Sequence, residues 1–301
     1  MATTMTENEQ TTDKPQNVIV VSSATKLVDR ATTEPRWVRY LLTGMALGFL
    51  LLFLFLPLIF MIFEALSGGV AYYFQALAEE DTQHALYLTL LAAAIAVPIN
   101  IVFGLAASWC IAKFEFPGKS ILITLIDLPF AISPVVAGLL FMLLFGLNGW
   151  FGEFLQAHNI KIIFAVPGVI IATLFVTFPF VARELIPVMQ SQGTEEEVAA
   201  RVLGANGWQI FWRVTLPNIK WGLLYGVILC NARAMGEFGA VAVVSGRFRK
   251  MTCTLPLHIE NLYSEDNYPA AFAVASLLAM LAIVTLIAKT IIEMKTAKER
   301  E

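Results

Sequence analysis

The chain has 301 residues, of which 58% are hydrophobic and only 14% are charged, and its formal net charge is -3. A soluble globular domain carries about a quarter of charged residues, so this composition argues against an ordinary soluble enzyme and indicates an integral membrane protein. The three cysteines have no CxxC spacing and the three histidines lie far apart in the sequence, so neither residue type predicts a metal site.

The chain begins with a polar segment that is rich in Thr, Gln and Asn. Its apolar patch, "VIVV" at 18–21, is too short for the core of a signal peptide. We therefore expect residues 1–36 to form a cytoplasmic N-terminal tail. Residues 37–84 would contain the first transmembrane helix and an outer segment, 64–84, which lacks Lys and Arg and could form an amphipathic helix.

Six stretches are long and apolar enough to cross the hydrocarbon core of a bilayer, which takes about 20 residues in a helix. The third stretch is interrupted by Asp127, and the fifth contains Arg233 and Glu237. The pattern predicts an all-α integral membrane protein with six transmembrane helices. These stretches are 40–63, 85–112, 120–146, 162–182, 219–245 and 267–288.

The basic residues predict the orientation, because cytoplasmic segments of membrane proteins are enriched in Lys and Arg. With the N-terminus inside, the outer segments hold Lys161, Arg247, Arg249 and Lys250, Arg233 lies within the membrane, and all the other basic residues are cytoplasmic. We therefore expect both termini to be cytoplasmic and the chain to lie in the cell inner (plasma) membrane.

The short turn before the third stretch reads "PGKS" at 117–120, which is the ending of a phosphate-binding loop. Such a loop also needs a Gly five residues before Gly118, and that position is Lys113. The turn lies between two spans with no strand before it, so it predicts no ATPase site. Lys119 is better interpreted as an anchor at the inner leaflet.

The third stretch contains two prolines in "IDLPFAISPVV". Pro129 and Pro134 each remove a backbone donor and disturb the helix. Unpaired N–H groups at such a break can bind an anion, as in other transporters with discontinuous helices, and Ser133 adds a hydroxyl. Ser133 and Pro134 are therefore candidates for a substrate pathway, and the alternative is a proline kink that serves packing alone.

The polar interruption at 194–217, "TEEEVAARVLGANGWQIFWRVTLP", separates two apolar spans. Its Glu and Ala residues are strong helix formers, and its acidic residues stand in the first turn, where they suit the helix dipole. The segment predicts a short helix, a turn after Gly204 and a second short amphipathic helix.

This loop resembles the signature of the membrane subunits of type I ABC importers, which is E-A-A, three residues, Gly, nine residues, Ile, one residue and Leu-Pro. The resemblance implies a coupling helix within a loop at about 190–217, which docks into a groove of the ATP-binding subunit. Position 198, where the motif has Glu, holds Val198 here, so docking would use a neighbouring Glu or would do without that charge. The candidate coupling residues are Glu195, Glu196, Glu197, Ala199, Ala200, Gly204, Val214, Leu216 and Pro217.

Longer motifs, "DLPFAISPVVAGLL", "TFPFVARELIPVM" and "NARAMGEFGAVAVVSG", make the chain similar to CysW-type permeases of sulfate/thiosulfate ABC importers. The resemblance implies a type I ABC importer permease fold with a core at 85–289 and a cytoplasmic C-terminal tail at 290–301. It also implies a second permease of the CysT or CysU type, two copies of a CysA-type ATP-binding subunit, and a periplasmic or extracellular sulfate-binding protein. The chain would lie in the lipid bilayer and would have no nucleic acid partner. ATP and Mg2+ would be used by the ATP-binding subunits, and this chain would bind no cofactor and would be no enzyme by itself.

Three charged residues near or within the membrane are further candidates for the pathway or a gate. Arg233 and Glu237 are four residues apart and share a helix face, so they would either line the pathway or form a structural bridge or gate at a subunit interface. Small residues next to them, Gly239 and Ala240 among them, would let another helix approach, which favours the subunit contact. Arg183 lies near the inner end of the fourth span and could belong to a cytoplasmic gate.

The sequence thus predicts a permease subunit that imports sulfate, or thiosulfate, with energy from a partner ATPase. The alternative within the same class is a permease for molybdate or another oxyanion. A passive channel would not need the coupling loop, and an intramembrane enzyme would need a nucleophile with a base, whereas the spans hold Ser133 without a histidine. Whether the partner permease is identical or different is left open by the sequence.

Overall fold

The computed structural model of the protein describes residues 36–300, and every regular element in this part of the chain is a helix. The tail expected over 1–36 therefore lies outside the described residues, apart from Arg36 at the start of the first helix. The chain divides into two compact units, 1–59 and 60–301.

The first unit consists of α2 (Arg36–Leu50), a π-helical turn η1 (Leu51–Phe55) and the first residues of α3 (Leu56–Ser67). Together α2, η1 and α3 give the apolar stretch Trp37–Ser67, whose most apolar part has no buried residue. The first predicted span is therefore a long apolar helix in the structure.

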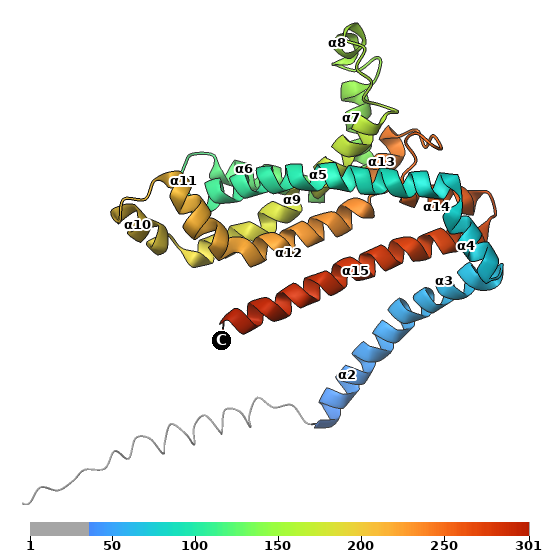
Figure 1. Ribbon diagram of the computed structural model, residues 1–301, viewed down its shortest axis with the longest axis horizontal. Coiled ribbons are helices and arrows are strands. Elements are labelled where there is room, and N and C mark those ends of the chain that lie inside the picture. The colour runs from blue at the N-terminus through green and yellow to red at the C-terminus, as the bar shows by residue number, and fades with distance from the viewer. Residues whose placement is uncertain (1–35, 301) are drawn as a thin grey trace, which may run out of the picture. The chain divides into compact units, whose positions relative to one another are not determined.

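Three long helices form the centre of the second unit: α5 (Glu80–Lys113), α9 (Val166–Gln192) and α12 (Leu216–Met235). They lie side by side in Figure 1 and pack against one another. Close packing depends on small residues, because a Cβ added at Gly104 of α5 would lie 2.8 Å from Cβ of Val181 on α9.

A buried amide also ties these three helices together. Asn100 of α5 donates a hydrogen bond of 2.8 Å to Thr177 Oγ1 on α9. The same amide nitrogen lies 3.7 Å from Cys230 Sγ on α12. Polar side chains inside a helix bundle hold neighbouring helices in register in this way.

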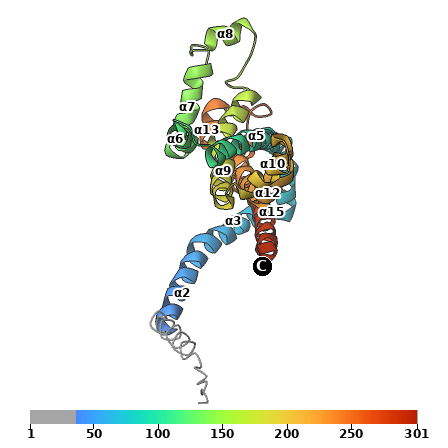
Figure 2. The same ribbon diagram turned by 90° about the vertical axis from the view of Figure 1, so that its left-hand side faces the viewer.

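Two of the predicted spans are broken rather than continuous. The third consists of α6 (Lys119–Ala131) and α7 (Pro134–Phe145), which meet at an angle of 106°. In the fifth, α12 ends at Met235 and a short helix α13 (Gly239–Val244) follows, so the prediction of one helix through 219–245 is wrong. Both views show α7 and the following α8 (Gly152–Ala157) projecting away from α5, α9 and α12 (Figure 1, Figure 2).

The remaining helices of the second unit include α4 (Val70–Ala78), which lies within the segment 64–84 where an amphipathic helix was expected. It packs on α15 (Tyr268–Arg300), and α14 (Leu255–Ser264) packs against α5 and α15. The segment that was expected as a tail from residue 290 is helical as far as Arg300.

The membrane-spanning capacity of the described residues is smaller than the sequence predicts. Four helices are long and apolar enough to cross a bilayer, and the bent pair α6–α7 raises this to five if it counts as one span. The broken α12–α13 segment is the predicted span that falls outside this set.

Candidate functional site

The break between α6 and α7 places a helix start next to a serine. Ser133 is exposed and precedes α7, its side chain makes no capping hydrogen bond, and Pro134 stands in the first turn. The first N–H groups of a helix have no partner within it, so the backbone of Val135 and Val136 offers donors beside the Ser133 hydroxyl. Donors of this kind suit an oxyanion that stays ionised.

The break between α12 and α13 is held by a buried carboxylate. Glu237 accepts a hydrogen bond of 3.0 Å from Ala240 N through Oε1, and its Oε2 lies 2.7 Å from Arg233 Nη1. The Glu237 side chain is 1% exposed, whereas that of Arg233 is 33% exposed. Glu237 therefore satisfies the start of α13 and fixes the guanidinium, which keeps donors available on its exposed side.

The two breaks meet in space, because α7 packs on α13. A Cβ added at Gly239 would lie 2.9 Å from Pro134 Cβ, and one added at Gly138 would lie 2.8 Å from the Ala240 carbonyl oxygen. The small residues at 239 and 240 were expected to favour a contact with another subunit. In the structure the helix that they admit is α7 of the same chain, so they carry no argument for a subunit contact.

Arg183 belongs to a second charged group, between α9 and α6. Its Nε lies 3.4 Å from Asp127 Oδ1, and its guanidinium carbon lies 5.2 Å from the centre of the Phe130 ring. The side chain of Arg183 is 58% exposed. Arg183 therefore links α9 to α6, the helix that precedes Ser133. Arg233 lies at the other break, between α12 and α13.

The segment that we expect to be the coupling loop has the predicted order of a short helix, a turn and a second short helix. These are α10 (Glu195–Val202) and α11 (Gly207–Ile210), and a π-helical turn η2 (Phe211–Thr215) joins α11 to α12 without interruption. Asn206 and Gln209 form a reciprocal capping box at the start of α11, with both hydrogen bonds 2.9 Å long.

The small residues of the coupling motif lie on and just after α10. Ala199 is exposed and Ala200 is half-buried, and Gly204 takes up a φ of 87° in the turn that ends this helix. That backbone conformation favours glycine. The later motif residues continue the helical path: Val214 and Leu216 are half-buried, and Pro217 is exposed in the first turn of α12.

Two of the three glutamates at the start of α10 are engaged within the chain. Glu197 lies 3.1 Å from Lys113 Nζ and accepts a hydrogen bond of 2.7 Å from Thr215, and Glu196 accepts a hydrogen bond from Asn218. The sequence indicates no partner for Lys113. Its pairing depends on a contact between residues far apart in sequence, which no local signal reveals.

The loop exposes five large apolar side chains. Val202 is 82% exposed, Leu203 87% and Trp208 71%, and Val198 and Trp212 are also exposed. We call these five residues the docking surface. Large apolar side chains exposed to this degree are typical of a protein–protein contact when they adjoin one another.

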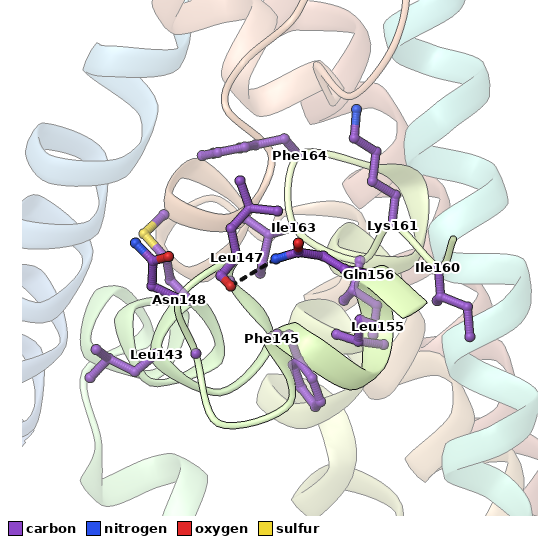
Figure 3. Close-up of a pocket in the computed structure, with 15 residues that line it drawn as sticks. Leu143, Phe145, Leu147, Asn148, Leu155, Gln156, Ile160, Lys161, Ile163 and Phe164 are labelled. Atoms are coloured by element: carbon purple, nitrogen blue, oxygen red, sulfur yellow. Dashed lines mark hydrogen bonds between the residues drawn. The ribbon is translucent and has the colours of Figure 1, made fainter. Parts of the chain in front are cut away.

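A hollow of about 370 Å³ lies between the end of α7, α8 and the segment 160–164 that precedes α9 (Figure 3). Its lining is mainly apolar, with Phe145, Leu155 and Ile163 among the side chains. The Gln156 amide donates to the Leu147 carbonyl oxygen over 3.0 Å. The polar side chains of Asn148 and Lys161 also line it.

Comparison with known proteins gives a consistent result. The family model described as "Binding-protein-dependent transport system inner membrane component" matches residues 101–298. The "Sulfate transport system permease protein CysW" of Synechocystis sp. is 55% identical over 87% of this chain and 95% of its own. CysW of Escherichia coli (strain K12) is 49% identical over 88% and 91%, and CysT of the same strain is 38% identical over 81% and 88%.

Solved structures match the fold at lower identity. The crystal structure of a bacterial alginate ABC transporter in complex with an alginate pentasaccharide-bound periplasmic protein contains a chain that is 19% identical, with a TM-score of 0.71. This match covers 84% of the present chain and 92% of the other. A second structure of a bacterial ABC transporter involved in alginate import gives a TM-score of 0.72 at 17% identity.

Proposed function

This chain belongs to the family of binding-protein-dependent transport system inner membrane components, and on that premise we propose that it is a permease subunit of an ATP-driven sulfate importer. The observation that carries the proposal is the coupling loop, which presents the exposed apolar docking surface while two of its three glutamates bind within the chain. A passive channel has no use for such a loop. The substrate assignment is supported by the similarity to sulfate permeases over most of both chains.

The proposed topology has six spans and cytoplasmic termini. Four apolar helices and the bent pair α6–α7 supply five spans, and α12 with α13 would supply the sixth. The excess of Lys and Arg in the segments assigned to the cytoplasm supports this orientation. The chain would lie in the inner or plasma membrane.

The similarity to CysW and CysT permeases and to ABC transporter structures supports the proposal of a second permease and a binding protein. A second permease of the CysT type would complete the pathway, and two ATP-binding subunits would dock on the coupling loops and use ATP and Mg2+. A periplasmic or extracellular sulfate-binding protein would deliver the anion. Closure of the ATP-binding subunits would move the coupling loops and turn the pathway from inward-open to outward-open.

The proposed pathway uses the two breaks. Ser133, the backbone donors that follow it at the start of α7, and the exposed side of Arg233 are the groups that would bind the dianion in passing. Pro134 shapes this turn by packing on Gly239. Glu237 would hold Arg233 rather than contact the anion, because its carboxylate is buried and already engaged. Arg183, paired with an aspartate of α6, would act nearer the cytoplasm.

The coupling role can be tested by changing the docking surface alone. In Val202→Asp and Leu203→Asp a charge would enter an apolar contact, so we expect the ATP-binding subunit to dissociate and ATP-dependent uptake to be lost. Ser120→Asp is the control, because Ser120 is exposed at the start of α6, where an acidic side chain suits the helix dipole. Co-purification and uptake in proteoliposomes measure both effects.

Deletion of 194–204 separates the rival functions. A channel would keep conducting without this segment, whereas an ABC permease would lose ATP-driven uptake and partner binding. Retention of ATP-dependent uptake after the deletion would contradict the proposed role of the loop.

A further inference from the structure

Lys113, at the end of α5, reaches into the coupling loop. Its side chain is only 7% exposed, its Nζ lies 3.1 Å from Glu197 Oε1, and it donates a hydrogen bond to the Gly193 carbonyl oxygen. A lysine this buried needs a charged partner and hydrogen-bond acceptors, because an unpaired charge is unfavourable away from water. The contact therefore binds α10 to the end of α5.

Glu197 extends the link to a third element. The carboxylate oxygen that faces Lys113 also accepts the hydrogen bond from Thr215, which is buried at the end of η2. A ring contact runs in parallel, with the centres of Trp109 on α5 and Phe211 on η2 lying 5.3 Å apart. We call Lys113, Glu197 and Thr215 the clamp.

The helix that begins beside the clamp leads to the proposed pathway. From Gly207 to Met235 the chain runs through α11, η2 and α12 without a break, and Arg233 stands in the last turn. At a rise of about 1.5 Å per residue, Thr215 and Arg233 lie roughly 27 Å apart along this helix. A continuous helix can transmit a displacement over that distance as a rigid rod.

The connection to α9 is of a different kind. Gly193 joins α9 to α10 with φ 67° and ψ -158°, a backbone conformation that is essentially restricted to glycine. The exposed Gln192 amide donates to the Asn218 carbonyl oxygen over 2.7 Å, which is a surface contact. The chain therefore passes from α9 to α10 through a single glycine, and the carbonyl oxygen of this glycine is itself bound by Lys113.

We infer that the clamp makes the coupling loop move as one body with the end of α5 and with the helix that carries Arg233. Lys113, Glu197 and Thr215 are then positioning residues for transport, which act between the docking surface and the pathway. This inference rests on the proposed function, because it describes how motion of an ATP-binding subunit reaches the anion.

The test compares sulfate uptake with ATP hydrolysis in proteoliposomes that hold the full transporter. In Lys113→Met and Glu197→Gln the docking surface is unchanged, so we expect assembly and hydrolysis to persist. The sulfate taken up per ATP should fall about tenfold, within the usual range of coupling between distant sites. The double variant should be no worse than the more impaired single variant, since both remove the same contact, and Lys113→Arg should retain most of the coupling.

The control is another Lys–Glu ion pair, which lies at the turn between α5 and α6. Lys119 and Glu115 lie 2.6 Å apart, and Glu115 is 90% exposed. Lys119→Met and Glu115→Gln should leave the ratio unchanged. An unchanged ratio in the clamp variants, or loss of assembly in both of them, would overturn the inference. If the unaltered transporter showed no ATP-dependent sulfate uptake, the proposed function would fail, and the inference with it.

Discussion

Arg233 Nη1 lies 2.7 Å from Glu237 Oε2, while the other oxygen of the same carboxylate accepts the hydrogen bond from Ala240 N. The pair is therefore a bridge within the chain and at the same time a support for a half-buried guanidinium. Sequence reasoning treated the bridge and the pathway as alternatives. The geometry allows Glu237 to serve the structure and Arg233 to serve the pathway.

Removing both charges of this pair distinguishes a structural bridge from a role in the anion pathway. Arg233→Ala alone would leave Glu237 buried and unpaired at a cost of about 3–5 kcal/mol. In the double variant Arg233→Met with Glu237→Gln, the new amide oxygen can still accept from Ala240 N. We expect this variant to assemble and its sulfate uptake to fall at least about tenfold, because a hydrogen bond to a charged group is lost.

The control for this double variant is Arg247→Met with Glu260→Gln, an exposed ion pair of 2.6 Å elsewhere in the chain. It should leave uptake unchanged. Loss of assembly in the Arg233 double variant would show that the pair serves structure alone, and full uptake would remove Arg233 from the pathway.

Gly138 should tolerate no side chain. A Cβ there would lie 2.8 Å from the Ala240 carbonyl oxygen and 2.8 Å from Val243 Cβ, so Gly138→Ala should separate α7 from α13 and destabilise the protein by about 1–3 kcal/mol. Gly44→Ala is the control, because nothing lies within 4 Å of a Cβ there. The melting temperature in detergent distinguishes them, and an equal temperature for both variants would contradict the packing described.

Gly193 is sensitive for a different reason. A Cβ at this position would meet nothing within 4 Å, so Gly193→Ala tests the backbone conformation alone, with an expected cost of about 1–3 kcal/mol. Gly118 has φ 91° and ψ 3°, which Asn adopts readily, and Gly118→Asn should therefore keep its thermal stability. Equal stability of Gly193→Ala and the unaltered chain would argue against this conformation.

His258 should make stability depend on pH. It is 1% exposed, and burial lowers the pKa of its ring, although Glu79 and Asp81 act in the opposite direction. Thr82 donates its hydroxyl hydrogen to the Ala76 carbonyl oxygen, so His258 Nε2 donates to Thr82 over 3.1 Å. This fixes the tautomer.

The sign follows from the lowered pKa. The unfolded chain binds the proton more readily, so the contribution of His258 is complete above its ordinary pKa of about 6.5 and is lost as pH falls through that value towards the folded pKa. We expect the melting temperature to fall between about pH 7.5 and about pH 5.5, and less so in His258→Gln. His158→Gln, at an exposed position, should behave as the unaltered chain, and identical slopes for all three would contradict the prediction.

The sequence predicted the helices well where their signal is local. Apolar runs of sufficient length marked five of the predicted spans, and the order of Glu, Ala and Gly marked the helix and turn of the coupling loop. Pro129 and Pro134 indicated that the third span is disturbed, and it is bent by 106°. The sequence did not predict that α12 ends at Met235, because Gly236 and Gly239 are equally compatible with a continuous helix that packs closely on another.

The contacts of the site were less accessible to sequence reasoning. Arg233 and Glu237 could be paired from their spacing, since both stand on one helix face. Lys113 and Glu197 come together only when the chain folds, and so do α7 and α13. Their partners are distant in sequence, so composition and periodicity do not indicate them.

The measurement that tests the central claim most directly is uptake of labelled anion into proteoliposomes that hold this chain with its partner permease, the ATP-binding subunits and the binding protein. The account predicts sulfate uptake that requires ATP and that excess molybdate barely inhibits. A preference for molybdate would contradict the substrate, and uptake without ATP would contradict the assignment as an ATP-driven importer.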